Sequence, residues 1–159
     1  MIGLCATGNI VNVDWLVKSG KANEALPADE FLVDDKEAEK KYDFSMEESV
    51  KRGNSMRENG EKLLSGWYVH VCKGVASNKA PPEKEMKLIV EVAGGEWLPS
   101  LTPKTTKDLD TYQLLIITSD PEQKKQISTK GVAAALQDGA TKKTTSWLFG
   151  CIMKQKLDL

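Results

Sequence analysis

The chain contains few of the residues that carry covalent and metal chemistry. Its 159 residues include one histidine, His70, and three cysteines, Cys5, Cys72 and Cys151. A structural zinc site needs four ligands of these types, and a Ser-His-Asp or Cys-His centre would depend on His70 alone. His70 lies in the apolar run WYVHVC, which is typical of a strand. We therefore predict no enzyme activity, no metal and no cofactor, and we expect the widely spaced cysteines to be reduced thiols.

Long hydrophobic runs and a strong charge of one sign are also missing. No apolar run approaches the roughly 20 residues of a membrane helix, and MIGLCATGN does not have the pattern of a signal peptide, so we predict no membrane partner. The formal net charge is −1, from 22 Lys and Arg against 23 Asp and Glu. Residues 1–62 carry 9 basic and 13 acidic residues, whereas residues 63–159 carry 13 and 10. This positive bias is too weak to predict nucleic-acid binding.

The segment from residue 64 to residue 118 alternates strand and helix patterns. LSGWYVHVC (64–72) is rich in aromatic and β-branched residues and predicts a strand. PPEKEMKLIVEVAGG (81–95) places apolar residues on one helical face between a Pro pair and a Gly pair, which predicts a helix. Trp97-Leu98 predicts a short strand, and the continuous apolar run YQLLIIT (112–118) is typical of a buried parallel strand.

The last forty residues predict two more helices and a weak strand. The sequence from Asp120 to Gln123, DPEQ, predicts an N-cap, a Pro at the first helical position and a capping-box partner for a helix that ends near Gly139. A weak strand is expected at residues 139–143. TTSWLFGCIMKQ (144–155) predicts a helix with Thr144 as its N-cap. Strands that alternate with helices predict an α/β fold with a parallel sheet.

Residues 1–62 have a different organisation. After a possible short strand at residues 10–11, Asn12-x-x-Trp15-Leu16 predicts a capped helix, and it matches Thr144-x-x-Trp147-Leu148 as a weak internal repeat. The acidic stretch over residues 28–49 is typical of a solvated connecting segment. Within it, Ser45-Met46-Glu47-Glu48 predicts the capping box of another helix.

Together these elements resemble the BRCT repeat, a small domain with a four-stranded parallel sheet flanked by three helices. The most telling marks are Gly94-Gly95 after the first helix and Trp147 in the last helix. The resemblance, strongest to tandem BRCT-repeat proteins of the DNA-damage response, implies a complete repeat at residues 63–159. The resemblance also implies that part of another BRCT repeat precedes the complete one, so that the chain holds a partial second BRCT repeat. This remnant is expected at 1–20. A helical inter-repeat linker is expected at 21–62, with its helix near 45–58.

The resemblance also implies a function. It predicts a non-enzymatic, phosphopeptide-recognition type of module in a nuclear DNA-damage-response scaffold. The expected partner is a phosphoserine-containing protein tail, such as that of a phosphorylated histone variant, or another repair protein. In this family the first repeat holds the phosphate, and the chain begins inside that repeat's second helix, so we expect this chain to lack the phosphate pocket. The alternatives are phosphate-independent binding of a protein or of DNA ends, and self-association through an uncovered apolar surface.

The resemblance places candidate binding residues on the complete repeat. The second-repeat side of the peptide groove is expected to comprise Gly74, Val75, Ser77, Thr145 and Phe149, although Phe149 could equally pack between repeats. A residual anion site is expected to comprise Lys73, Lys124, Lys125 and Lys130, the alternative being solvated helix lysines. Lys142 departs from the apolar pattern of the last strand, so that strand is expected to be either frayed or at an exposed edge.

Overall fold

The computed structural model describes residues 1–76 and 80–159. Its strands are β1 (Tyr68–Val71), β2 (Glu96–Trp97), β3 (Leu114–Thr118) and β4 (Thr141–Thr144). Its α-helices are α1 (Ile2–Ala6), α2 (Val13–Ala22), α3 (Lys36–Tyr42), α4 (Met46–Glu58), α5 (Glu83–Val92), α6 (Pro103–Lys107), α7 (Lys124–Ile127), α8 (Lys130–Gln137) and α9 (Thr145–Lys154). Two short 3-10 helices are η1 (Ala28–Phe31) and η2 (Thr111–Gln113). No helix in the described part of the chain is both long and apolar enough to cross a membrane.

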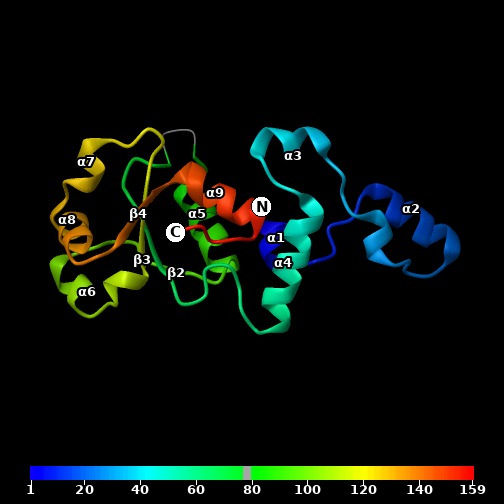
Figure 1. Ribbon diagram of the computed structural model, residues 1–159, viewed down its shortest axis with the longest axis horizontal. Coiled ribbons are helices and arrows are strands. Elements are labelled where there is room, and N and C mark those ends of the chain that lie inside the picture. The colour runs from blue at the N-terminus through cyan, green and yellow to red at the C-terminus, as the bar shows by residue number, and fades with distance from the viewer. Residues whose placement is uncertain (77–79) are drawn as a thin grey trace.

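The four strands form one parallel sheet in the order β2-β1-β3-β4, which confirms the predicted fold class. Residues 68–71 of β1 pair with 114–117 of β3, and residues 115–118 of β3 pair with 141–144 of β4. Helices cover both faces of the sheet: α6, α7 and α8 lie on one side, and α5 and α9 on the other (Figure 1). All five residues of β3 are buried, as expected for a parallel strand covered on both faces.

Alternate residues of β3 belong to two hydrophobic clusters. Leu115 and Ile117 pack with apolar residues of α5 and α9, including Val90 and Leu148. Leu114 and Ile116 belong to the second cluster, on the α8 side of the sheet. The period of two along a strand therefore divides the core into two layers.

Gly94 and Gly95 follow α5 for steric reasons. Gly94 has a φ of +90°, and a Cβ at this position would lie 2.7 Å from the Cβ of Lys62. A Cβ on Gly95 would lie 3.1 Å from the Cβ of Leu64. The chain before β1 thus passes so close to the end of α5 that a side chain at position 94 would clash and one at position 95 would be crowded.

The segment after β3 differs from its prediction. Asp120 is not an N-cap: α7 begins at Lys124 after Gln123, and the Asp120–Pro121 peptide bond is cis. The buried side chain of Gln126 explains the difference, because its Oε1 accepts hydrogen bonds from the Ser119 backbone N–H at 3.1 Å and the Ser119 hydroxyl at 3.0 Å. Residues 119–123 therefore curve around this amide instead of forming the first turn of a helix.

Lys142 lies at an exposed edge of the sheet, as one of the two alternatives expected. The strand is regular, since β4 pairs with β3 over four residues. As β4 is the last strand in the sheet order, the exposed Lys142 side chain reaches solvent, and its Nζ lies 2.7 Å from a carboxylate oxygen of Glu122. The charge is therefore tolerated at this position.

In residues 1–62 two predicted helices are confirmed and two elements were not foreseen. The Asn12 side chain caps α2 by accepting from the Asp14 backbone N–H at 3.0 Å, and Ser45 caps α4 by accepting from Glu48 N–H at 3.3 Å. The predicted strand at 10–11 is reduced to one antiparallel bridge between Val11 and Leu32. The helices η1 and α3 occupy the segment that the sequence indicated only as a solvated connection.

Candidate functional site

Four helices join the N-terminal segment to the sheet domain. Helix α1 packs against α4, α5 and α9, an arrangement that we call the helix junction. The Arg57 guanidinium spans it, donating to the Leu4 carbonyl at 3.2 Å and to Asn54 Oδ1 at 2.7 Å. The buried Gln155 amide, just after α9, donates to the thiol sulfur of Cys5 at 3.4 Å. The junction is thus held by buried and partly buried polar contacts as well as by apolar packing.

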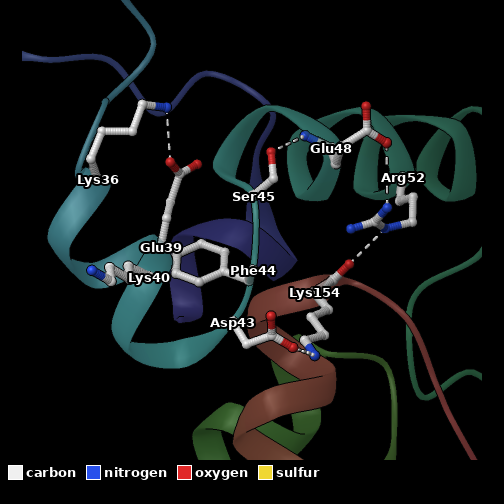
Figure 2. A pocket seen from close by; sticks show the side chains of 9 residues that line it. All are labelled: Lys36, Glu39, Lys40, Asp43, Phe44, Ser45, Glu48, Arg52 and Lys154. Atoms are coloured by element: carbon white, nitrogen blue, oxygen red, sulfur yellow. Dashed lines mark hydrogen bonds and ion pairs between the residues drawn. The ribbon is translucent and has the colours of Figure 1, made fainter.

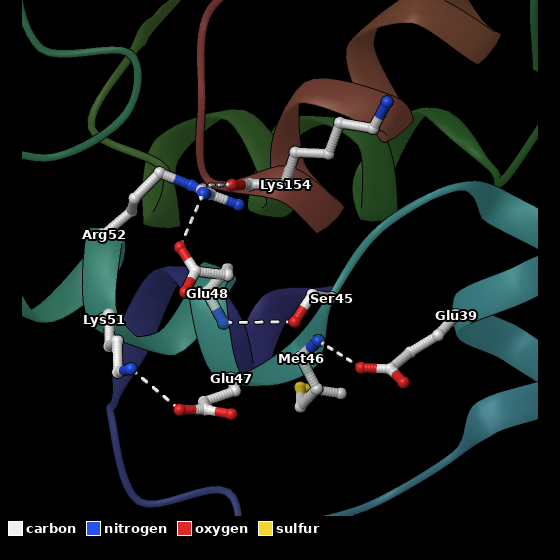
Figure 3. A network of polar contacts seen from close by, with 8 residues as sticks. All are labelled: Glu39, Ser45, Met46, Glu47, Glu48, Lys51, Arg52 and Lys154. Atoms are coloured by element: carbon white, nitrogen blue, oxygen red, sulfur yellow. Dashed lines mark hydrogen bonds and ion pairs between the residues drawn. The ribbon is translucent and has the colours of Figure 1, made fainter.

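Arg52 fixes α4 against the end of α9 (Figure 3). Its Nε donates to the Lys154 carbonyl at 2.7 Å and so satisfies one of the last carbonyls of α9, which have no partner within the helix. Arg52 also forms an ion pair with Glu48 at 3.5 Å. The Lys154 ammonium lies 3.0 Å from a carboxylate oxygen of Asp43, which connects α9 to the end of α3.

An open pocket lies between α3, α4 and the end of α9 (Figure 2). Its volume is about 680 Å³, and it is lined by Lys36, Glu39, Lys40, Asp43, Phe44, Ser45, Glu48, Arg52 and Lys154. Its charges are largely paired with one another, since Lys36 lies 2.9 Å from both Asp34 and Glu39. The Lys36 ammonium and the Met46 backbone N–H lower the pKa of Glu39. The ion pairs Lys36–Glu39, Arg52–Glu48 and Lys154–Asp43 thus use most of the charges that line the pocket.

The predicted groove residues lie on both faces of the sheet. Val75 is fully buried in the cluster on the α8 side, and Gly74 beside it is exposed with a φ of +85°. Thr145 is buried in the first turn of α9, and Phe149 packs against the cluster on the opposite face. Ser77 lies outside the described residues. The structure therefore brings Gly74 and Val75 together and Thr145 and Phe149 together, but it places Val75 and Phe149 on opposite faces.

The predicted anion site is divided as well. Lys73 and Lys125 line one groove with Gly74, whereas Lys124 and Lys130 are exposed and are not among its lining residues. The groove has a volume of about 530 Å³, and it is lined by His70, Cys72, Lys73, Gly74, Pro99, Ser100, Leu101, Lys125, Gln126, Thr129 and Val132. We call it the α8-side groove.

The three cysteine thiols and the imidazole of His70 are buried. Burial raises the pKa of the Cys72 thiol to about 11, and it raises the pKa of Cys5 and of Cys151. These thiols are therefore protonated at neutral pH. Burial lowers the pKa of His70, whose ring Nδ1 lies 2.9 Å from the Leu98 carbonyl oxygen. Within residues 1–76 and 80–159, no three His, Cys, Asp or Glu residues are grouped so that they could hold a metal ion.

The parallel sheet with helices on both faces and a helical extension defines a three-layer α/β domain. The model of the BRCT domain matches residues 62–159. The chain therefore belongs to the BRCT domain family, as the sequence indicated.

Named relatives give the same family context. The chain is 38% identical over 107 residues to mediator of DNA damage checkpoint protein 1 of Homo sapiens, a match that covers 65% of this chain and 5% of that protein. It is 32% identical over 90 residues to PAX-interacting protein 1 of Bos taurus, covering 57% of this chain and 8% of that protein. The chain thus matches only a small part of the length of these relatives.

A solved structure extends the likeness to almost the whole chain. The crystal structure of the S. pombe Brc1 BRCT5-BRCT6 domains superposes with a TM-score of 0.71 at 23% identity, covering 98% of this chain and 73% of that one. At this level of identity the match shows the fold. It includes nearly all of residues 1–61, which lie outside the 62–159 match.

Proposed function

We propose that this chain is a non-enzymatic protein-interaction module of the phosphopeptide-recognition type, in a nuclear DNA-damage-response scaffold. Membership of the BRCT family and similarity to a DNA damage checkpoint mediator support this function. The observation that carries it is the helix junction, in which α1 of the N-terminal segment packs against α4, α5 and α9. The likeness to a two-domain BRCT structure over 98% of the chain supports the same arrangement.

We propose further that residues 1–20 are the end of a first repeat, that 21–62 form an inter-repeat linker, and that 63–159 form a complete repeat. Matching details in α2 and α9 support this division. The Trp15 indole N–H donates to the Leu26 carbonyl at 2.8 Å, and the Trp147 indole N–H donates to the Asp158 carbonyl at 2.8 Å, in both cases 11 residues further along the chain. The two segments of the internal repeat therefore share a hydrogen bond as well as their sequence spacing.

The same proposal divides the binding surface between repeats. The family resemblance implies that the phosphate is held by a Ser or Thr hydroxyl and a backbone N–H at the end of the first strand of the first repeat, with a Lys or Arg from its second helix. This sequence contains none of those positions. A doubly charged phosphate requires several converging donors. We therefore expect this chain alone to supply the second-repeat side of the surface, through Thr145 and Phe149 on α9, without a complete phosphate pocket.

Calorimetry with paired peptides tests the proposal. A phosphoserine tail peptide of a histone variant and its unphosphorylated twin are titrated into this chain and into a version extended to supply a complete first repeat. We expect only the extended version to bind the phosphopeptide with preference. A preference by this chain alone would show that its phosphate pocket is complete, and equal binding of the twins by both versions would favour phosphate-independent recognition.

Exposed apolar residues favour the alternative of a phosphate-independent contact. Val13, Leu16 and Val17 lie on one face of α2 and are all exposed. Apolar residues gathered on one exposed helical face are typical of an interaction surface or of self-association. Binding of the unphosphorylated twin peptide would indicate phosphate-independent recognition, and sedimentation of the chain as a dimer or larger species would indicate self-association.

A further inference from the structure

A second hollow of the linker lies between α4 and the segment of residues 28–34 that contains η1. Its volume is about 520 Å³, and we call it the α4–η1 groove. One wall is formed by residues that share a single face of α4, which are Met46, Glu47, Val50, Lys51 and Asn54. Figure 3 shows Met46, Glu47 and Lys51 on one side of α4, and Arg52, which contacts the end of α9, on the other. The groove therefore lies on the side of α4 away from the end of α9.

Both walls of the groove are attached to the turn that follows α1. In the wall opposite α4, the Val33 backbone N–H donates to the Ile10 carbonyl at 2.9 Å. On the α4 side, the Asn54 amide lies directly over Gly8, where a Cβ would overlap it. The separation of the walls is thus fixed before any ligand enters, which lowers the entropy cost of binding.

The groove has an apolar lining. Leu32, Val33, Met46 and Val50 line it, and each of the four is half-buried. Among the residues that the structure describes, none of the four belongs to the two hydrophobic clusters of the sheet domain or packs against them. Part of their apolar surface is therefore open to the groove. It can cover an apolar side chain of a ligand, or the methylene stem of a long basic one.

The charges that line the groove are mainly negative. Its ionisable groups are two lysines and four carboxylates, namely Lys36, Lys51, Asp29, Asp34, Glu39 and Glu47. Both ammonium groups are already paired, since Lys36 lies 2.9 Å from Asp34 and from Glu39, and Lys51 lies 2.7 Å from Glu47. Asp29 is exposed, and its side chain makes no ion pair or hydrogen bond within residues 1–76 and 80–159. The groove therefore has an excess of carboxylates, one of which has no cation beside it.

We propose that the α4–η1 groove is a protein-interaction site that binds a basic segment of a partner. An Arg or Lys of that segment places its charged group beside Asp29, and a neighbouring apolar side chain packs over Leu32 and Met46. Charge complementarity selects this occupant, because the excess of carboxylates repels an acidic peptide and the phosphates of a nucleic acid. The site adds to the proposed function, and it depends neither on a phosphate pocket nor on Thr145 and Phe149.

Nuclear magnetic resonance titration of the labelled chain tests this site. The probe is the acetylated, amidated peptide Ala-Arg-Leu-Arg-Ala. One control peptide replaces both Arg residues by citrulline, which keeps their shape and removes their charge, and a second replaces Leu by Ser. We expect amide shifts at Gly8, Asp29 and Val50. The Arg peptide should bind at least about tenfold more tightly than the citrulline peptide, and at least about threefold more tightly than the Ser peptide.

Two double variants provide a matched comparison. Asp29→Asn with Glu47→Gln should weaken binding of the Arg peptide at least about tenfold, whereas Glu24→Gln with Glu58→Gln should change it by less than about twofold. Each variant removes two negative charges from exposed residues, and the two control positions are not among the residues that line the groove. Circular dichroism checks that each variant is folded. Asp29→Asn alone, which breaks no ion pair, provides a milder version of the same test.

Several results would overturn the proposal. Equal binding of the Arg and citrulline peptides would show that charge does not select the ligand, and equal losses in the two double variants would reduce the effect to long-range attraction. Shifts centred on Phe44 and Arg52 would place the peptide in the pocket of Figure 2. Shifts of the groove amides that depend on protein concentration, without peptide, would assign the groove to a second copy of the chain. Because these measurements use neither a phosphopeptide nor a complete first repeat, failure here is distinguishable from failure of the proposed function.

Discussion

Helices α2 and α9 share their local chemistry but not their surroundings. Each begins at a side-chain N-cap, Asn12 in α2 and Thr144 in α9, and each ends at a residue in the left-handed conformation. Their burial is very different: Leu16 in α2 is 66% exposed, whereas Leu148 at the matching position of α9 is 0% exposed. The same local pattern therefore gives a core helix in one place and a solvated helix in the other.

The difference arises from what lies next to each helix. Helix α9 packs against β3 and β4, and its apolar residues lie in one cluster with those of β3 and α5, whereas α2 packs against the short helix η1. Figure 1 shows α2 at the end of the molecule away from the sheet. Local hydrogen bonds nevertheless maintain the end of α2, since the Leu26 backbone N–H donates to the Ser19 hydroxyl at 3.1 Å. Caps and turns form from nearby residues, while burial requires a distant partner.

The largest expected effect tests this comparison directly. Leu148→Ala should lower the free energy of unfolding by about 2–5 kcal/mol, because it leaves a cavity in a closed core. Leu16→Ala, the matched change in α2, should alter it by no more than about 0.5 kcal/mol. Urea denaturation followed by tryptophan fluorescence measures both. Similar losses in the two variants would show that α2 is buried in solution and would break the comparison.

Smaller effects on stability, opposite in sign to each other, are expected at two helical glycines. Gly131→Ala in α8 should destabilise the protein by about 1–3 kcal/mol, because the new Cβ meets the backbone of Leu101. Gly20→Ala in α2 should stabilise it by up to about 1 kcal/mol, since nothing lies within 4 Å of that Cβ and Ala is the better helix former. Thermal unfolding of the two variants, compared with the parent, gives the sign of the stability change in each. A stabilising Gly131→Ala would mean that α8 does not pack closely on the Leu101 loop.

Substitution of Trp15 in α2 and of Trp147 in α9 should lower stability by similar amounts, because this feature is shared by the two helices. Trp15→Phe and Trp147→Phe each remove one indole donor to a carbonyl 11 residues away, and each should cost about 0.5–1.5 kcal/mol. Equal costs would show that this bond is a local feature of both helices, independent of the sheet. Chemical denaturation of both variants makes the measurement, and a cost found only at Trp147 would tie the bond to core packing.

Much of the fold was predictable because its signals are local. The N-caps Asn12, Ser45 and Thr144, the Gly94-Gly95 pair and the continuous apolar run of β3 each act within a few residues. The start of α7 was not predictable from DPEQ. It depends on the side chain of Gln126, which accepts from Ser119 seven residues earlier and so prevents a helical turn there.

The candidate site was predictable only in part, for a related reason. The sequence marked four lysines, but only Lys73 and Lys125 line the same groove. Their meeting depends on the Gln126 bond to the Lys73 carbonyl, a contact across 53 residues that no local pattern reveals. The role of Arg52 in capping α9 was missed for the same reason, because its partner Lys154 is 102 residues away.

The smallest expected effect on stability comes from substitutions on the exposed apolar face of α2. Leu16→Lys with Val17→Lys should lower the binding of a hydrophobic dye and any self-association, because these exposed side chains form the apolar face with Val13. Ser55→Lys with Gln137→Lys adds the same charge at exposed positions elsewhere and is the matched control. Dye fluorescence and sedimentation velocity measure the effects, and urea denaturation should show a change of no more than about 0.5 kcal/mol in either variant. If both double variants lowered dye binding equally, net charge would account for the change, and α2 would not be the uncovered counterpart of α9.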